Sequence, residues 1–146
     1  MSTRKPDAGV ARAGSSAASS RRRRRGLLVV DDDPLIRWSL REALRKDYRL
    51  WLTDSAEKAL AWLPRLKRLD AVIADVRLPG LDGIEFLGRV RKERPALKVF
   101  LMTAYDLDRA PRKAFSVRAD GCLFKPFDLS TVKDMLASHL SGGRPS

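Results

Sequence analysis

Residues 27–34 read LLVVDDDP, a short apolar run followed by three aspartates and a proline. Four apolar residues in a row, two of them β-branched, are typical of a strand that is buried on both faces of a parallel sheet. The carboxylates come where this strand must end, and Pro34 suits the first turn of a following helix. The stretch therefore predicts a strand–helix unit with acidic side chains at the carboxyl end of its strand.

The rest of the chain repeats this alternation. Further strands are expected at residues 48–53, 71–74, 99–102 and 122–124. A helix is expected after Pro34, and others at residues 55–67, 84–93, 108–118 and 128–140. The helix at 108–118 requires Pro111 to fall in its first turn. Five successive strand–helix units predict an α/β fold, with a doubly wound parallel sheet and helices on both of its faces.

Length and composition limit the organisation of the chain. Its 146 residues suffice for one domain with a core but not for two. A hydrophobic content of 44% and a charged content of 33% are ordinary for a globular domain. No run approaches the roughly 18 apolar residues of a membrane span. The single cysteine, Cys122, cannot form an internal disulfide, which favours a reducing, cytoplasmic setting.

The net charge of +12 is concentrated in the first 25 residues, where eight basic residues stand against one acidic residue. This segment is rich in Ala, Ser and Gly and has no aromatic residue, so we expect a disordered Arg-rich tail over 1–25. A domain over 26–141 and a flexible C-terminus over 142–146 would follow it. We expect no export signal here, because the apolar region of such a signal needs roughly 7–15 residues and the run after the arginines stops at Asp31.

The run Arg21–Arg25 leaves three interpretations open. It is a solvated tail without a role, an electrostatic anchor for nucleic acid or anionic lipid, or a docking element for an acidic partner protein. Any nucleic-acid binding through this run alone is expected to be weak and salt-sensitive.

Four of the predicted strands deliver polar side chains at their carboxyl ends. In an open parallel sheet, ligands bind in the crevice beyond these ends. If the strand order is 2-1-3-4-5, the first and third strands are neighbours, and their carboxylates lie close together. The side chains, in chain order, are Asp31, Asp32 and Asp33, then Asp75, Thr103 and Lys125.

Three neighbouring carboxylates repel one another by about 4 kcal/mol per pair at about 4 Å, for an effective dielectric of about 20. A divalent cation relieves this repulsion, and ligands that are all oxygen favour Mg²⁺, with Mn²⁺ as the alternative. Lys125 and Thr103 add an ammonium group and a hydroxyl group. Together these groups suit a transferring phosphoryl group, and a carboxylate can itself be the nucleophile. The residues therefore predict a phosphoryl-transfer site.

Four motifs, in this order and spacing, resemble response-regulator receiver domains of bacterial two-component systems. They are LVVDDDP at 28–34, ADVRLPGLDG at 74–83, LMTA at 101–104 and FKPF at 124–127. The resemblance runs from about Gly26 to Leu140 and implies the flavodoxin-like, CheY-like sheet order 2-1-3-4-5. It also implies a cis peptide bond between Lys125 and Pro126.

The same resemblance implies roles for the residues at the strand ends. Asp75 would be the phosphoacceptor, and Thr103 and Lys125 would bind the phosphoryl oxygens. Mg²⁺ would be held by the acidic residues and by one backbone carbonyl. These metal ligands would be Asp31, Asp32, Asp75 and the carbonyl of Arg77.

The family also implies partners. The donor would be a phosphohistidine of a sensor histidine kinase or a phosphotransfer protein, and a downstream protein effector would read the phosphorylated state. The expected chain is a phosphoacceptor that assists its own phosphorylation and dephosphorylation, and not an enzyme that turns over an external substrate.

One position departs from the family pattern. Cys122 stands three residues before Lys125, where such domains usually carry Tyr or Phe, so the usual aromatic readout is in doubt. Tyr105 is the nearest aromatic residue that could replace it. Arg77 and Tyr105 also stand two residues beyond Asp75 and Thr103. Both are bulky enough to hinder an attacking water, so we expect a long-lived phosphoryl state.

Two other classes of function fit the sequence less well. A phosphatase of the haloacid-dehalogenase type needs Asp-x-Asp-x-Thr/Val on its first strand, but Leu35 stands at the fifth place and no substrate-enclosing cap is available. The remaining alternative is a nucleic-acid-binding protein that works through its basic tail and keeps a degenerate receiver scaffold. Deletion of residues 1–25 would then abolish binding and leave phosphorylation unchanged.

Overall fold

The computed structural model describes residues 23–104 and 119–140. Most of the expected tail, Tyr105, the helix expected at 108–118 and the expected flexible C-terminus lie outside these ranges. Five parallel strands form one sheet in the order β2-β1-β3-β4-β5, so the expected order is confirmed. The strands are β1 (Arg25–Val30), β2 (Tyr48–Thr53), β3 (Ala71–Asp75), β4 (Lys98–Ala104) and β5 (Gly121–Lys125).

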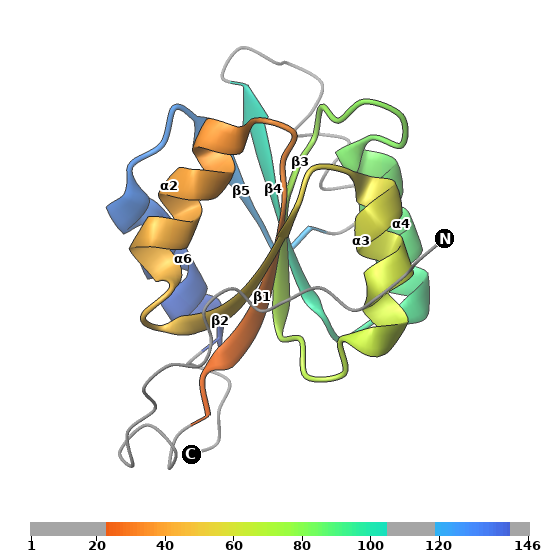
Figure 1. Ribbon diagram of the computed structural model, residues 1–146, viewed down its shortest axis with the longest axis horizontal. Helices are drawn as coiled ribbons and strands as arrows, with labels where there is room; N and C mark the ends of the chain where they lie inside the picture. The colour runs from red at the N-terminus through yellow and green to blue at the C-terminus, as the bar shows by residue number, and fades with distance from the viewer. Residues whose placement is uncertain (1–22, 105–118, 141–146) are drawn as a thin grey trace.

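Helices cover both faces of the sheet, as Figure 1 shows. Helices α2 (Pro34–Leu44) and α6 (Leu129–Leu140) lie on one face, and α3 (Ala56–Trp62) and α4 (Gly83–Glu93) lie on the other. Alternate residues of each strand face opposite ways, so β1 contributes Leu27 and Val29 to the core under α2 and α6. Leu28 and Val30 enter the core under α3 and α4. The chain is therefore a doubly wound α/β domain.

Side-chain caps mark where three of the helices begin. Asp33 accepts from the backbone N–H of Leu35 before α2, and Ser55 accepts from that of Lys58 before α3. Asp82 accepts from the N–H of Glu85 before α4. Each cap satisfies a backbone donor that has no partner within its own helix. Asp33 and Asp82 thus have local roles at helix starts.

Two boundaries differ from the sequence prediction. Strand β1 begins at Arg25, which pairs with Tyr48, two residues before the strand expected from Leu27. The helix expected at 55–67 ends at Trp62 and continues as the short 3-10 helix η1 (Leu63–Arg65). Pro64 cannot donate a backbone hydrogen bond, which favours the tighter turn there.

The connection from β3 to α4 depends on two glycines. Gly80 has φ of 78°, a left-handed conformation that side chains rarely adopt. A Cβ atom at Gly83 would overlap the backbone carbonyl of Asp75, so only glycine lets α4 begin this close to the end of β3. The Lys125–Pro126 peptide bond is cis, as expected. Within the described ranges, every helix is too short or too polar to cross a membrane.

Candidate functional site

The register of the sheet brings its polar strand ends together. Val30 pairs with Ala74, so Asp31 and Asp75 each stand one residue beyond a matched pair. Asp75 in turn pairs with Met102, the residue before Thr103. Lys125, the last residue of β5, pairs with Ala104. All the strand-end residues that the sequence singled out are thus brought to one edge.

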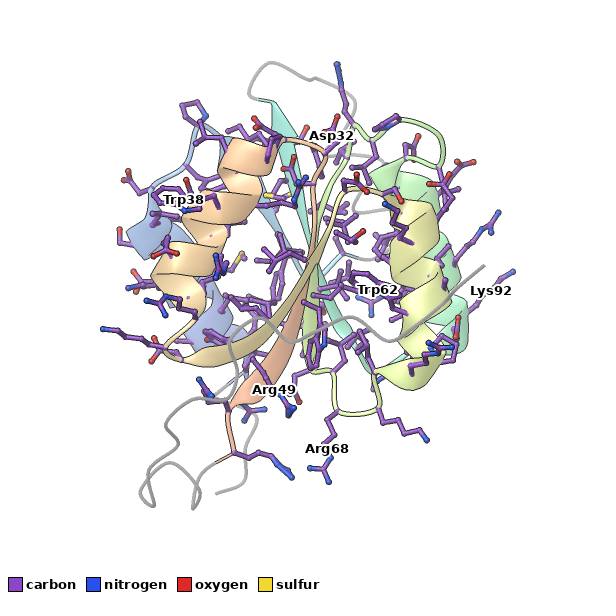
Figure 2. All side chains as sticks on the ribbon, viewed as in Figure 1. Asp32, Trp38, Arg49, Trp62, Arg68 and Lys92 are labelled. Atoms are coloured by element: carbon purple, nitrogen blue, oxygen red, sulfur yellow. The ribbon has the colours of Figure 1, made fainter. Side chains whose placement is uncertain are left out.

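Three carboxylates form a cluster at this edge. Asp31, Asp32 and Asp75 each offer one oxygen, and these oxygens lie within 4.8 Å of one another. Asp31 is fully buried and Asp75 is 6% exposed, whereas Asp32 faces solvent at the upper end of the molecule in Figure 2. A donor set made of carboxylate oxygens, with one ligand accessible from outside, fits a hard divalent cation such as Mg²⁺ or Mn²⁺.

One ammonium group connects two of the carboxylates. Lys125 Nζ donates to Asp75 Oδ2 at 2.9 Å and to Asp31 Oδ2 at 3.1 Å. The single positive charge therefore lies between two buried negative charges and offsets part of their repulsion. Negative charge remains in excess in the cluster, which is the condition under which a cation is attracted.

The pKa values of Asp31 and Lys125 reflect this balance of charges. Burial, followed by the nearby charge of Asp75, raises the pKa of Asp31, although the Asp33 amide and Lys125 act in the opposite direction. For Lys125, burial is the largest single influence and lowers the pKa. The hydrogen bond to Asp75 and the charges of Asp31 and Asp75 together outweigh it, so the pKa of Lys125 is raised. Lys125 is therefore held as an ammonium ion.

Backbone contacts orient the two buried carboxylates. The N–H of Asp31 donates to the carbonyl of Thr53 at 3.1 Å, and Asp31 Oδ1 accepts from the N–H of Asp33 at 2.8 Å. On the other strand, Asp75 Oδ1 accepts from the N–H of Arg77 at 3.1 Å. Each carboxylate thus presents one oxygen to the backbone and the other to Lys125.

Two side chains that sequence reasoning missed support the loops around the cluster. Arg37 Nη1, on α2, donates to the Asp31 carbonyl at 2.7 Å. Glu57 Oε2, on α3, accepts from the N–H of Leu81 at 2.8 Å and so ties down the loop between β3 and α4. Arg37 lies within six residues of the aspartates, so a helical projection could have found it. Glu57 is 24 residues from Leu81, and no local pattern signals that contact.

The remaining predicted residues occupy different surroundings. Thr103 is buried at the end of β4, with 1% of its surface exposed. The side chain of Arg77 is exposed, while its amide contacts Asp75. Cys122 is half-buried beside the core opposite Leu101, and this burial raises the pKa of its thiol. Cys122 therefore packs against the core as a small hydrophobic residue.

Known proteins share both the sequence pattern and the fold. The model of the response regulator receiver domain matches residues 27–137. Response regulator protein FleR of Pseudomonas aeruginosa is 42% identical over 113 residues, which cover 73% of this chain and 24% of FleR. DNA-binding transcriptional regulator NtrC of Salmonella typhimurium is 39% identical over 111 residues, or 75% of this chain and 23% of NtrC. The chain thus spans about a quarter of the length of these relatives.

Solved structures of known proteins have the same fold as this chain. The chemotaxis protein CheY4 of Vibrio cholerae superposes with a TM-score of 0.76 at 27% identity, covering 81% of this chain and 100% of CheY4. The signal receiver domain of an HD domain-containing protein from Pseudomonas fluorescens gives a TM-score of 0.77 at 28% identity, covering 82% and 97%. With the matched motifs and the sheet order, these findings identify the chain as a member of the response regulator receiver domain family of two-component systems.

Proposed function

We propose that this receiver domain is a phosphoacceptor switch in a phosphorelay, with Asp75 as the residue that takes the phosphoryl group. The observation that carries the proposal is the bridge from Lys125 Nζ to Asp31 Oδ2 and Asp75 Oδ2, inside a cluster of three carboxylates. A buried nucleophile, an ammonium group and an excess of oxygen ligands meet at one point. This combination is what phosphoryl transfer to a carboxylate requires.

The transfer itself needs few groups. A carboxylate oxygen of Asp75 attacks the phosphorus of a phosphohistidine, an O–P bond forms as the P–N bond breaks, and the released imidazole nitrogen takes up a proton from solvent. Lys125 redirects a hydrogen bond from the carboxylates to a phosphoryl oxygen, and the Thr103 hydroxyl donates to another. Both donors stabilise charge that is spread over the equatorial oxygens.

The acidic cluster supplies the metal ligands in this proposal. Asp31, Asp32, Asp75 and the backbone carbonyl of Arg77 would hold Mg²⁺, or Mn²⁺ in its place. When bound, the cation offsets the charge of the carboxylates and of the incoming phosphoryl group. Asp32 is the exposed member of the set and leaves a route for the ion from solvent.

The proposed partners follow from the family. A sensor histidine kinase or a phosphotransfer protein in the cytoplasm would donate the phosphoryl group, and a downstream protein effector would read the result. The domain at 26–141, with its basic tail and short C-terminus, would act as a switch without turnover of an external substrate. A degenerate receiver scaffold is not favoured, because all three acidic residues and Lys125 are in place.

The test is the intact mass of the full chain after incubation with acetyl phosphate, with and without Mg²⁺. We expect a magnesium-dependent gain of one phosphoryl group in the wild type and none in Asp75→Asn. Asp134→Asn on the exposed side of α6 is the matched control and should gain it normally. No gain in the wild type, or an equal gain in Asp75→Asn, would overturn the assignment.

The lifetime of the phosphoryl group tests a second part of the proposal. Arg77 adjoins the acceptor, because its amide contacts Asp75, and its bulk would hinder an attacking water. We expect slow loss of the phosphoryl group in the wild type and faster loss in Arg77→Ala, followed by intact mass after removal of the donor. A half-life of seconds in the wild type would contradict this part alone.

A further inference from the structure

A second charged cluster lies at the amino ends of β1 and β2. The three segments 23–26, 45–49 and 65–70 carry nine basic side chains and two acidic ones, a net charge of +7. Only the first of these segments belongs to the arginine run, Arg21–Arg25, in the sequence. The fold adds the other two, so the excess charge belongs to the folded domain as well as to the tail.

Backbone contacts bring the three segments together. Arg24 Nη1 donates to the carbonyl of Arg45 at 3.2 Å, and Gly26 pairs with Arg49 in the parallel register. The carbonyl of Arg68 lies so close to Gly26 that an added Cβ would stand 2.6 Å from it. Figure 2 places Arg49 and Arg68 at the lower end of the molecule, opposite Asp32.

The acidic side chains nearby neutralise only part of this charge. Asp70 accepts from the Gly26 amide at 2.8 Å and lies 3.7 Å from Arg25, while Glu42 lies 3.8 Å from Arg45. Asp47 is exposed. Within the described ranges, the exposed cations of these segments that have no carboxylate partner include Arg49, which lies over the Trp51 ring, together with Lys46, Lys67 and Arg68. We call seven of the nine basic side chains in these segments the amino-end basic face: Arg24, Arg25, Arg45, Lys46, Arg49, Lys67 and Arg68.

We propose that the amino-end basic face binds the phosphate backbone of duplex DNA without sequence selectivity. Arginine predominates on it, and the guanidinium fork matches phosphate oxygens in pairs. Duplex DNA offers one negative charge per roughly 1.7 Å, a density suited to a clustered set of cations. No strand or helix of the described fold projects from this end to read base edges, so the contact rests on charge alone.

The surroundings of the face favour a nucleic acid over a lipid surface. Binding to a bilayer draws on apolar side chains that enter the headgroup region. In the described part of the chain, the large exposed hydrophobic residues lie on α2, at the end of β5 and at the start of α6, near the opposite edge of the sheet. They are Leu35, Trp38, Phe124 and Leu129.

The position of the face predicts how it relates to phosphorylation. Strand β1 has six residues, so it separates the face from Asp31 by about 20 Å. This distance exceeds the Debye length of about 8 Å at physiological salt. DNA binding and phosphorylation of Asp75 should therefore be compatible, and a phosphoryl group should leave the affinity for DNA unchanged.

The experiment is fluorescence anisotropy of a labelled random-sequence duplex with the full chain, across about 50 to 200 mM salt. The test variant is Arg49→Gln, Lys67→Gln, Arg68→Gln combined. The matched control, Lys58→Gln, Arg89→Gln, Lys133→Gln, removes three exposed cations from helices. We expect the test variant to bind about tenfold more weakly at low salt, with a salt slope reduced by about 2 to 3, and the control to bind like the wild type.

Several outcomes would overturn the proposal. Equal binding by the test variant and the wild type would show that the residues the fold adds to the arginine run contribute nothing to the affinity. Tighter binding to phosphatidylserine vesicles, or displacement of the duplex by polyglutamate more readily than by unlabelled DNA, would assign the face to a lipid or an acidic protein. Absence of binding at low salt would show that the amino-end basic face does not bind DNA. Circular dichroism and acetyl phosphate labelling of Asp75 show whether each variant is folded.

Discussion

At the carboxyl end of the sheet, the segments 31–34, 53–58, 75–85 and 125–128 hold nine acidic and three basic side chains, a net charge of −6. At the amino end, the three segments of the basic face have a net charge of +7. The carboxylates at the two ends also differ in their hydrogen-bond and ion-pair partners. Asp120, at the amino end of β5, accepts from Arg91 Nη2 at 2.6 Å and from the Val99 amide at 2.8 Å.

The carboxylates at the other end share their partners. Asp31 and Asp75 have one ammonium group between them, and Asp32 has no ion pair within the described ranges. A carboxylate with its own cation and its own backbone donor stabilises the fold and has its charge balanced. A cluster with fewer cations than carboxylates keeps a net negative charge that attracts a further cation. The difference teaches that the surplus of charge, and not burial itself, separates a candidate site from a structural ion pair.

The largest effect should come from removing the shared cation. Lys125→Met keeps an unbranched side chain and deletes the ammonium group that contacts Asp31 and Asp75. We expect the rate of labelling by acetyl phosphate to fall by about a hundredfold, the usual loss when one donor to a developing charge is removed. Lys133→Met, on the exposed side of α6, should label at the wild-type rate. An unchanged labelling rate for Lys125→Met would show that the shared ammonium group does not contribute to phosphoryl transfer, and would contradict the account of the acidic end.

The ion pair near the amino ends of β4 and β5 should affect stability and not chemistry. Asp120→Ala leaves Arg91 and the Val99 amide without their acceptor. We expect the free energy of unfolding to fall by about 1–3 kcal/mol, measured by urea denaturation. Labelling of Asp75 should be unchanged under conditions where the variant is folded, and Asp134→Ala should change neither quantity. A loss of labelling at unchanged stability would contradict the division between the two ends.

Asp31, the fully buried member of the acidic cluster, should cost stability when no metal is bound. Because burial raises the pKa of Asp31, its ionised form is disfavoured in the fold relative to the unfolded chain. This cost is present at neutral pH and disappears as the pH falls below the ordinary value of 3.8. Asp31→Asn should therefore raise the Tm at neutral pH without Mg²⁺, and the gain should shrink in acid.

Thermal unfolding at both pH values, with and without Mg²⁺, checks this sign. Added Mg²⁺ should raise the Tm of the wild type more than that of the variant. A lower Tm for Asp31→Asn at neutral pH would show that the ion pair with Lys125 outweighs the cost of burial.

The smallest effect is expected at the loop between β3 and α4. The hydrogen bond from the Leu81 amide is the main cause that lowers the pKa of Glu57, so the carboxylate that accepts this bond persists in mild acid. Glu57→Ala should speed hydrogen exchange at Leu81 severalfold and slow labelling of Asp75 slightly. Glu93→Ala, at the exposed end of α4, is the control. An unchanged exchange rate at Leu81 would show that Glu57 does not hold the loop between β3 and α4.

The sequence by itself determined the order of the elements and the polar residues at the strand ends. Apolar runs, helical periodicity and the position of Pro34 are local signals, because they depend on neighbours within one or two turns. Local patterns do not specify the strand order 2-1-3-4-5. The sequence supports this order only through the family resemblance, and the observed sheet confirms it. The end of α3 was misjudged, since Pro64 and the contacts of Arg94 with the Leu63 and Leu66 carbonyls close that turn early.

Only the tertiary structure decided which distant groups meet. Glu57 reaches Leu81 across 24 residues and Arg91 reaches Asp120 across 29, and no local pattern encodes either pair. The amino-end basic face has the same origin. From the sequence, the positive charge belongs mainly to the first 25 residues, but β1 runs between β2 and β3 and so gathers Arg49 and Arg68 around its own start. Strand neighbours are chosen by packing over the whole sheet, and that choice sets where charge accumulates.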